Sequence, residues 1–222
     1  MSGARELAPG LHHWTTRHPE WHPGAFGAEV GSFSLVGGDD LLLVDPLVGD
    51  DEDVVATLDA LAGRATATHI LITIGYHVRS AALLSARYGA PVHGPETVRG
   101  RLDDDRAFRR LAPGATGPAG VTAYAIGRPR RSELPLWLPS HQAIAFGDAL
   151  VTTPAGELRM WIQDELTDAR RAFYRDRFAP TLEPLRALPA TRILTTHGPP
   201  VPSDGAAALA SALDAEPWRH RG

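Results

Sequence analysis

Residues 69–80, with the sequence HILITIGYHVRS, predict a buried strand that runs directly into a loop of chemically active side chains. The first five residues are mostly isoleucine and leucine without polar alternation, which is typical of a strand covered on both faces. Tyr76, His77, Arg79 and Ser80 follow within one loop. Loops at strand ends gather ligand-binding and catalytic groups in proteins that combine strands and helices. This segment therefore indicates both the fold class and the place of a candidate site.

The chain on either side alternates between strand and helix patterns. The sequence GGDD at 37–40 separates two apolar runs and predicts a hairpin turn. Acidic residues at 50–53 and Gly63 are typical start and stop signals of a helix. Strands are expected at 11–16, 32–36, 41–44, 69–73, 91–93, 121–126, 134–138, 143–146 and 191–195. Helices are expected at 79–88, at 167–188 with a break at Pro180, and at 203–213, in addition to the one before Gly63. This alternation predicts an α/β layered fold, with residues 103–120 as a surface excursion.

Composition excludes several classes of chemistry. The chain has 222 residues and 22 basic side chains, all of them arginine, and it contains no lysine, cysteine or asparagine. A P-loop lysine, a Schiff-base lysine, a thiol nucleophile and a cysteine-ligated metal are therefore excluded. The net charge of −4 gives no electrostatic reason to bind nucleic acid or an anionic membrane. No apolar run approaches the roughly 20 residues of a spanning helix, and no boundary interrupts the apolar segments. We expect one domain over residues 1–222, in a soluble cytoplasmic protein.

Three polar clusters follow buried apolar strands. They lie at residues 73–80, 146–149 and 196–200, and their most reactive side chains are His77, Asp148 and His197. The sequence has no G-x-S-x-G nucleophile elbow and no G-x-G-x-x-G dinucleotide fingerprint after a strand. Histidine and carboxylate groups are consequently the expected carriers of any chemistry.

The order of these clusters resembles the metallo-β-lactamase-fold superfamily. The resembling segments are the opening strands at 32–46, the strand, metal loop and helix at 70–92, the bridging-aspartate segment at 136–150, and the closing histidine loop at 192–200. The resemblance covers residues 11–201. It implies a four-layer αβ/βα sandwich, with two mixed β-sheets face to face and helices outside. It also implies one or two metal ions, often zinc, at one edge, and hydrolysis of ester, thioester, amide or phosphodiester bonds.

The metal motif of that superfamily is mostly replaced here. The H-x-H-x-D-H motif should begin directly after the strand, yet its four ligand positions hold Ile74, Tyr76, Val78 and Arg79. The stretch 126–131, where the third motif normally supplies a histidine, has none. Only Asp148 and His197 match the ligands of the superfamily, and two ligands are too few for a firm zinc site. The resemblance therefore implies a degenerate metal site that holds at most one zinc or other divalent ion.

The residues of the first cluster have alternative roles. His77 is either a slipped ligand or general base, or a strand-end histidine bonded to the backbone. Arg79 has no lone pair and cannot coordinate a metal. It could take the place of a cation by pairing with Asp148 or Asp45, or it could bind a substrate carboxylate or phosphate. Tyr76 could donate its hydroxyl in a pocket or pack as an aromatic ring.

Supporting roles are expected for three further residues. Asp45 should lie near the metal edge and bond to the motif loop, and Ser80 should support it. Arg128, in a basic run at 128–131, could contact an anionic ligand. His141 is expected at a hairpin tip on the surface.

Two functions remain open at this level. The first is a hydrolase-like enzyme with a mononuclear or metal-free site, in which His77, Arg79 and Tyr76 carry catalysis. The second is a metal-free, non-catalytic member that binds a small anionic molecule or a protein partner. A homo-oligomer is compatible with both.

Overall fold

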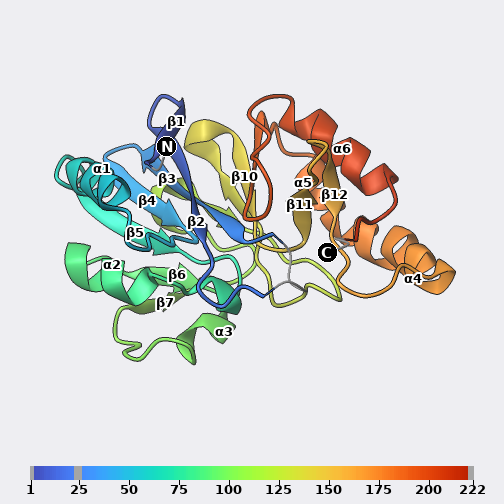
Figure 1. Cartoon of the computed structure of the whole chain (residues 1–222), viewed down its shortest axis with the longest axis horizontal. Coiled ribbons are helices and arrows are strands. Elements are labelled where there is room, and N and C mark those ends of the chain that lie inside the picture. Colours follow the sequence, from blue (N-terminus) through green and yellow to red (C-terminus); the bar gives the residue numbers. More distant parts are fainter. Residues whose placement is uncertain (1–2, 23–26, 220–222) are drawn as a thin grey trace.

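A mixed seven-stranded sheet carries the first half of the chain (Figure 1). The computed structural model describes residues 3–22 and 27–219. The strand order is β1-β2-β3-β4-β5-β6-β7; the first four strands are antiparallel and the last four are parallel. The strands are β1 (Arg5–Ala8), β2 (Leu11–Arg17), β3 (Glu29–Gly37), β4 (Asp40–Val44), β5 (Ala67–Leu71), β6 (Val92–Gly94) and β7 (Phe108–Arg110).

The second half of the chain forms a smaller mixed sheet. Its order is β13-β10-β9-β8, with β10 parallel to β13 and antiparallel to β9. A two-stranded sheet pairs β11 with β12. These strands are β8 (Thr122–Ala123), β9 (Leu136–Leu138), β10 (Ala143–Phe146), β11 (Leu150–Thr152), β12 (Leu158–Met160) and β13 (Arg192–Thr195).

Helices lie on the outer side of each half (Figure 1). The α-helices are α1 (Glu52–Ala62), α2 (Ala81–Tyr88), α3 (Glu96–Arg99), α4 (Asp168–Phe173), α5 (Glu183–Arg186) and α6 (Gly205–Asp214). The acids at 50–53 mark the start of α1 as expected, and Asp51 is its N-cap, because its carboxylate accepts the N–H groups of residues 53 and 54. Gly89 ends α2, and its φ of 63° is left-handed.

Three apolar clusters separate four layers. Leu41 and Leu43 of β4 pack with α1 and α2, whereas Leu42 and Val44 of the same strand face the second sheet. A third cluster joins the second sheet to residues 174–182, α5 and α6. The apolar run 41–44 is therefore buried on both faces, as its lack of polar alternation predicts. The layers run helix, sheet, sheet, helix, in agreement with the predicted fold class.

Some local expectations need correction. The surface excursion at 103–120 contains β7, which completes the larger sheet because its backbone pairs with β6. The break expected at Pro180 in the helix at 167–188 is present but wider than predicted: α4, a π-helical turn, a 3₁₀ turn and α5 follow one another, since Pro180 cannot donate a backbone hydrogen bond. His141 is buried (9% exposed), and its Nε2 bonds the Pro9 carbonyl at 3.1 Å. No helix within residues 3–22 and 27–219 is long and apolar enough to cross a membrane.

The strand directions bring the polar clusters to one edge. Asp45 and Thr73 follow the carboxyl ends of the parallel pair β4 and β5. Asp148 and His197 follow the carboxyl ends of the parallel pair β10 and β13. Two backbone hydrogen bonds join the two halves of the fold at this edge. Leu134 N–H donates to the Thr73 carbonyl (2.8 Å), and the N–H of Gly31 in β3 donates to the Thr196 carbonyl after β13 (2.7 Å). The candidate site lies there.

Candidate metal centre

The Asp45 carboxylate orients the His77 ring. Asp45 is 2% exposed, and its oxygens accept the Thr73 backbone N–H (2.8 Å) and the Thr73 hydroxyl. The same carboxylate lies 2.9 Å from Nδ1 of His77. An Nδ1–H that donates to Asp45 leaves Nε2 directed into the site, so the ring is held with one tautomer and one orientation. Asp45 thus holds both the Thr73 main chain and the His77 ring at this edge.

A second buried carboxylate holds the loop that carries Asp148. Glu133 is fully buried, and its side chain accepts three backbone N–H groups, from Gly147 (2.9 Å), Asp148 (2.9 Å) and Ala149 (2.8 Å). Gly147 is needed here because a Cβ would lie 2.7 Å from the Thr73 hydroxyl oxygen. Burial and the neighbouring Asp148 charge raise the pKa of Glu133 to about 7. The loop is therefore fixed from below by hydrogen bonds, and Asp148 projects from it into the site.

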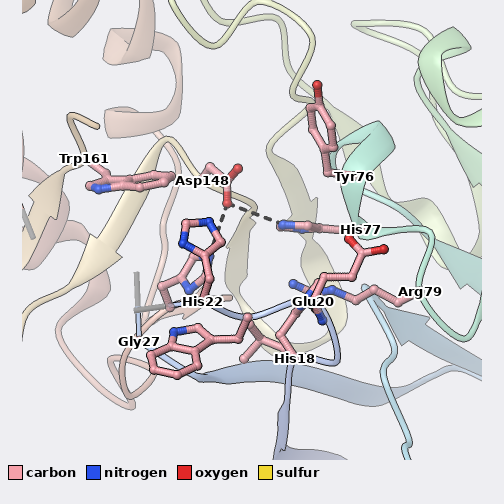
Figure 2. A pocket seen from close by; sticks show the side chains of 12 residues that line it. His18, Glu20, His22, Gly27, Tyr76, His77, Arg79, Asp148 and Trp161 are labelled. Carbon is pink, nitrogen blue, oxygen red and sulfur yellow. Dashed lines mark hydrogen bonds and ion pairs between the residues drawn. The ribbon is translucent and has the colours of Figure 1, made fainter. Parts of the chain in front are cut away.

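Three potential metal ligands, His77, Asp148 and His197, converge at this edge. Figure 2 shows His77 and Asp148 directed toward each other. Asp148 Oδ1 lies 3.4 Å from His77 Nε2 and 3.5 Å from His197 Nε2, and one ligand atom from each residue lies within 4.8 Å of the others. Donor atoms about 2.1 Å from a tetrahedral ion are roughly 3.4 Å apart. Asp148 Oδ1 is buried and has no hydrogen-bond donor in bonding geometry within the described part of the chain. The donor set fits one divalent ion, and the bond from Asp45 to His77 is typical of the support that metal-ligating histidines receive.

The charges of the three groups depend on one another. Burial alone would raise the pKa of Asp148, but His77 and His197 outweigh it and hold this pKa well below its usual range. Burial and Arg79 lower the pKa of His77, whereas Asp45 and Asp148 raise it more, so the net direction is upward. Burial lowers the pKa of His197. Asp148 is consequently an anion at neutral pH, as a metal ligand must be.

A cavity of about 220 Å³ opens on the three ligands. Aromatic groups, including Trp161 and Tyr76, line it together with Arg79 and His18 (Figure 2). Apolar walls around a few convergent polar groups are typical of small-molecule sites.

Solved structures with this arrangement of layers align with nearly the whole chain. For the metallo-β-lactamase from Erythrobacter litoralis the TM-score is 0.63 at 21% identity, with 95% of this chain and 94% of that chain covered. For the metallo-β-lactamase from Pontibacter korlensis the TM-score is 0.63 at 14% identity, with 96% and 98% covered. For DIM-1 metallo-β-lactamase the TM-score is 0.66 at 11% identity, with 96% and 95% covered. This chain has the metallo-β-lactamase fold. No protein-family model matches the sequence, and neither does any curated protein.

The metallo-β-lactamase fold places most of the predicted site residues together. His77, Asp148 and His197 meet, and the ring of His77 points into the cavity rather than to the backbone. Tyr76 is at the cavity rim and 68% exposed, with the Arg101 guanidinium 4.1 Å from its ring centre. Ser80 lies beside the site and accepts the Val48 backbone N–H at 3.2 Å.

Two arginines differ from the sequence-based expectations. Within residues 3–22 and 27–219 no carboxylate oxygen lies within 4.0 Å of the Arg79 nitrogens, and Asp45 and Asp148 act on its charge only from farther away. Its NH1 donates to the main-chain carbonyls of Asp45 (3.0 Å) and Gly31 (3.5 Å). Arg128 is exposed and does not line the cavity. Its neighbour Arg130 lies 3.8 Å from Asp148 Oδ2. The direction of the turn at 127–131 decides which arginine reaches the site, and no sequence pattern specifies it.

Sequence reasoning also missed Glu133 and Trp161. Glu133 directly precedes an apolar strand, a place where a solvated acid is common. Trp161 follows β12 and stacks beneath the Arg130 guanidinium at 4.6 Å. An acid next to an apolar segment was the only available signal for Glu133, and it did not reveal the backbone groups that meet the carboxylate.

Proposed function

We propose that this chain is a hydrolase-like member of the metallo-β-lactamase superfamily that binds one divalent ion through His77, Asp148 and His197. Its substrates would be small molecules with ester, thioester or similar bonds. The convergence of these three ligand atoms on one cavity carries the proposal. Two histidines and one carboxylate match catalytic zinc sites, in which three protein ligands leave one position open. Ordinary dinuclear zinc hydrolysis is not proposed, because Ile74, Tyr76, Val78 and Arg79 occupy the positions of the usual ligands.

The residues of the site have separable tasks. The Nδ1–H group of His77 donates a hydrogen bond to the Asp45 carboxylate, and the Nε2 lone pair faces the cavity. Asp148 supplies the negative charge, and the loop 147–149 holds it in place. Tyr76, at the rim, can donate its hydroxyl to an oxygen that gains negative charge. A divalent ion in such a site supplies Lewis acidity toward a carbonyl oxygen and toward water.

A metal-free member that binds a small anion is the second candidate. It is favoured by the closeness of Asp148 to both imidazoles, since a proton on either ring would also stabilise the cluster. The raised pKa of His77 also favours a protonated ring, and therefore this metal-free candidate. The two candidates differ in metal content, which can be measured directly.

Zinc stoichiometry tests the proposal. The purified full chain is stripped with a chelator, titrated with zinc by calorimetry, and analysed for metal after dialysis. We expect close to one equivalent per chain, which D148A and H197A abolish and the control H12Q keeps. Near-zero uptake would select the metal-free candidate, and two equivalents would contradict the single-ion site. Zinc-dependent hydrolysis of p-nitrophenyl acetate that is lost in D148A would support a catalytic function. If zinc-loaded protein hydrolyses neither esters nor thioesters, the proposed catalytic function is contradicted.

A double substitution tests the effect of the replaced ligands. Val78→Asp with Arg79→His restores two ligand types of the superfamily motif and removes one fixed positive charge. We expect zinc uptake to rise toward two equivalents. Unchanged uptake would mean that Arg79 does not limit metal binding.

A further inference from the structure

Arg79 is held rigidly beside the candidate metal centre. It follows the short 3₁₀ helix at residues 75–77, and its φ of 41° is left-handed, which is uncommon for a residue other than glycine. Its NH1 atom donates to two main-chain carbonyls, at the end of β4 and in β3. These bonds fix one corner of the guanidinium and leave its other N–H groups for another partner.

No carboxylate of the described residues is in direct contact with Arg79. No carboxylate oxygen there lies within 4.0 Å of its nitrogens, and its Nε atom is buried without a hydrogen-bond partner. The nearby Arg130, by contrast, has both Asp148 and the face of Trp161. Asp45 and Asp148 act on the Arg79 charge only from beyond ion-pair distance, and a ligand anion in direct contact with the guanidinium would add to that stabilisation.

The cavity places Arg79 next to the three metal ligands. Arg79 and His77 are two residues apart and line the same space (Figure 2). An anionic group on Arg79 would therefore leave the rest of a bound molecule beside Asp148 and His197. The planar fork of a guanidinium matches a carboxylate in a bidentate manner.

The volume of the cavity and the charges that line it limit which molecules it can bind. The cavity of about 220 Å³ is smaller than the roughly 300–1,000 Å³ of pockets for drug-sized molecules. Glu20 also lines it, together with the Asp148 carboxylate, and these negative charges favour a monoanion over a dianionic phosphate.

We infer that Arg79 is the carboxylate-binding residue of this cavity, and that the substrate is a small ester or thioester carrying one free carboxylate. The inference about the substrate rests on the proposed function, whereas carboxylate binding by Arg79 does not. Hydrolysis adds one water across the acyl C–O or C–S bond and releases an acid with an alcohol or a thiol. No further co-reactant is required.

Binding to the metal-free protein tests the role of Arg79 on its own. Monomethyl succinate and its uncharged analogue dimethyl succinate are titrated into chelator-treated protein by calorimetry or NMR. The wild-type chain should bind the monoanion at least tenfold more tightly than the neutral diester. R79Q should lose that preference, and R79K, which cannot form the bidentate pair, should keep part of it.

Arg192 provides the matched control. It is also half-buried, bonds a main-chain carbonyl (His141, 2.9 Å) and has no acidic partner in the described residues, but it does not line the cavity. R192Q should keep the preference within twofold. Because R79Q could destabilise the loop, melting temperatures are measured first, and the comparison of the two esters on the wild-type chain stands without any variant. Equal wild-type binding of both esters would overturn the inference, as would full preference in folded R79Q.

Turnover separates this inference from the proposed function. In zinc-loaded protein R79Q should raise KM for monomethyl succinate at least tenfold and leave KM for dimethyl succinate within twofold. Zinc uptake without carboxylate preference would overturn the Arg79 inference alone. Carboxylate preference without zinc uptake would overturn the proposed function and leave Arg79 as the anion-binding residue.

Discussion

Removal of the Glu133 carboxylate should destabilise the whole edge of the fold that carries the candidate site. Glu133→Ala leaves the backbone N–H groups of Gly147, Asp148 and Ala149 without their acceptor. A buried donor that loses its partner costs about 1–3 kcal/mol. Three such donors predict a loss of about 3–6 kcal/mol in the free energy of unfolding, with some relief where water enters the space. That is a large part of the total stability of a typical domain.

Glu133→Gln separates the hydrogen bonds from the filling of space. One carboxylate oxygen accepts the Gly147 N–H and the other accepts the N–H groups of Asp148 and Ala149. Glutamine has one acceptor oxygen, so it can keep two bonds while its NH₂ group faces the third donor. The expected loss is about 1–3 kcal/mol. Displacement of Asp148 should also weaken zinc binding by about 10–100-fold, as is typical of groups that orient a metal ligand.

Urea denaturation followed by tryptophan fluorescence gives the unfolding free energies. The control is Glu157→Ala, which removes an exposed carboxylate paired with Arg159 and should change stability by less than about 0.5 kcal/mol. The loss should be largest for Glu133→Ala, smaller for Glu133→Gln and smallest for the control. If Glu133→Ala and Glu157→Ala have equal stability, the three hydrogen bonds do not hold the loop and the reasoning fails.

Three further substitutions test other parts of the fold, each by denaturant or thermal unfolding. Gly198 has φ 80°, and a Cβ there would overlap the Thr152 carbonyl, so Gly198→Ala should lower the free energy of unfolding by about 2–4 kcal/mol. The control Gly100→Ala lies in open space and should be neutral or slightly stabilising, and equal effects of the two changes would contradict this prediction. Burial, with nearby positive charge, lowers the pKa of His93 to about 4 from its usual 6.5. The unfolded chain then binds the proton first, so stability should fall between pH 6.5 and pH 4, and His93→Gln should reduce that fall; an unchanged pH dependence would count against it. Asp51→Ala should cost about 1 kcal/mol through loss of the α1 cap, and a change below about 0.3 kcal/mol would show that the cap contributes little.

Much of the fold could be predicted because its signals are local. The apolar run 41–44, the acids before α1 and Gly89 after α2 each act on their own neighbours in the chain. The strands β1, β7, β11 and β12 were not predicted, since they have three or four residues and are stabilised mainly by pairing with other strands. The order of strands and helices was sufficient for an α/β layered fold, because apolar periodicity determines which face each element buries, and the four-layer sandwich was implied by the resemblance to the superfamily.

The order of residues along the chain was enough to predict that polar groups at 73–80, 148 and 197 follow buried strands, whereas their position at one edge was implied only by the resemblance to the superfamily. Which atoms meet at that edge depends on the three-dimensional packing. His77 is oriented by Asp45, 32 residues earlier, Asp148 is held by Glu133 through the backbone, and Arg130 reaches Asp148 while Arg79 bonds main-chain carbonyls. Hydrogen bonds and ion pairs require donor and acceptor within a few tenths of an ångström, and that precision comes from the packing of two sheets rather than from spacing along the chain.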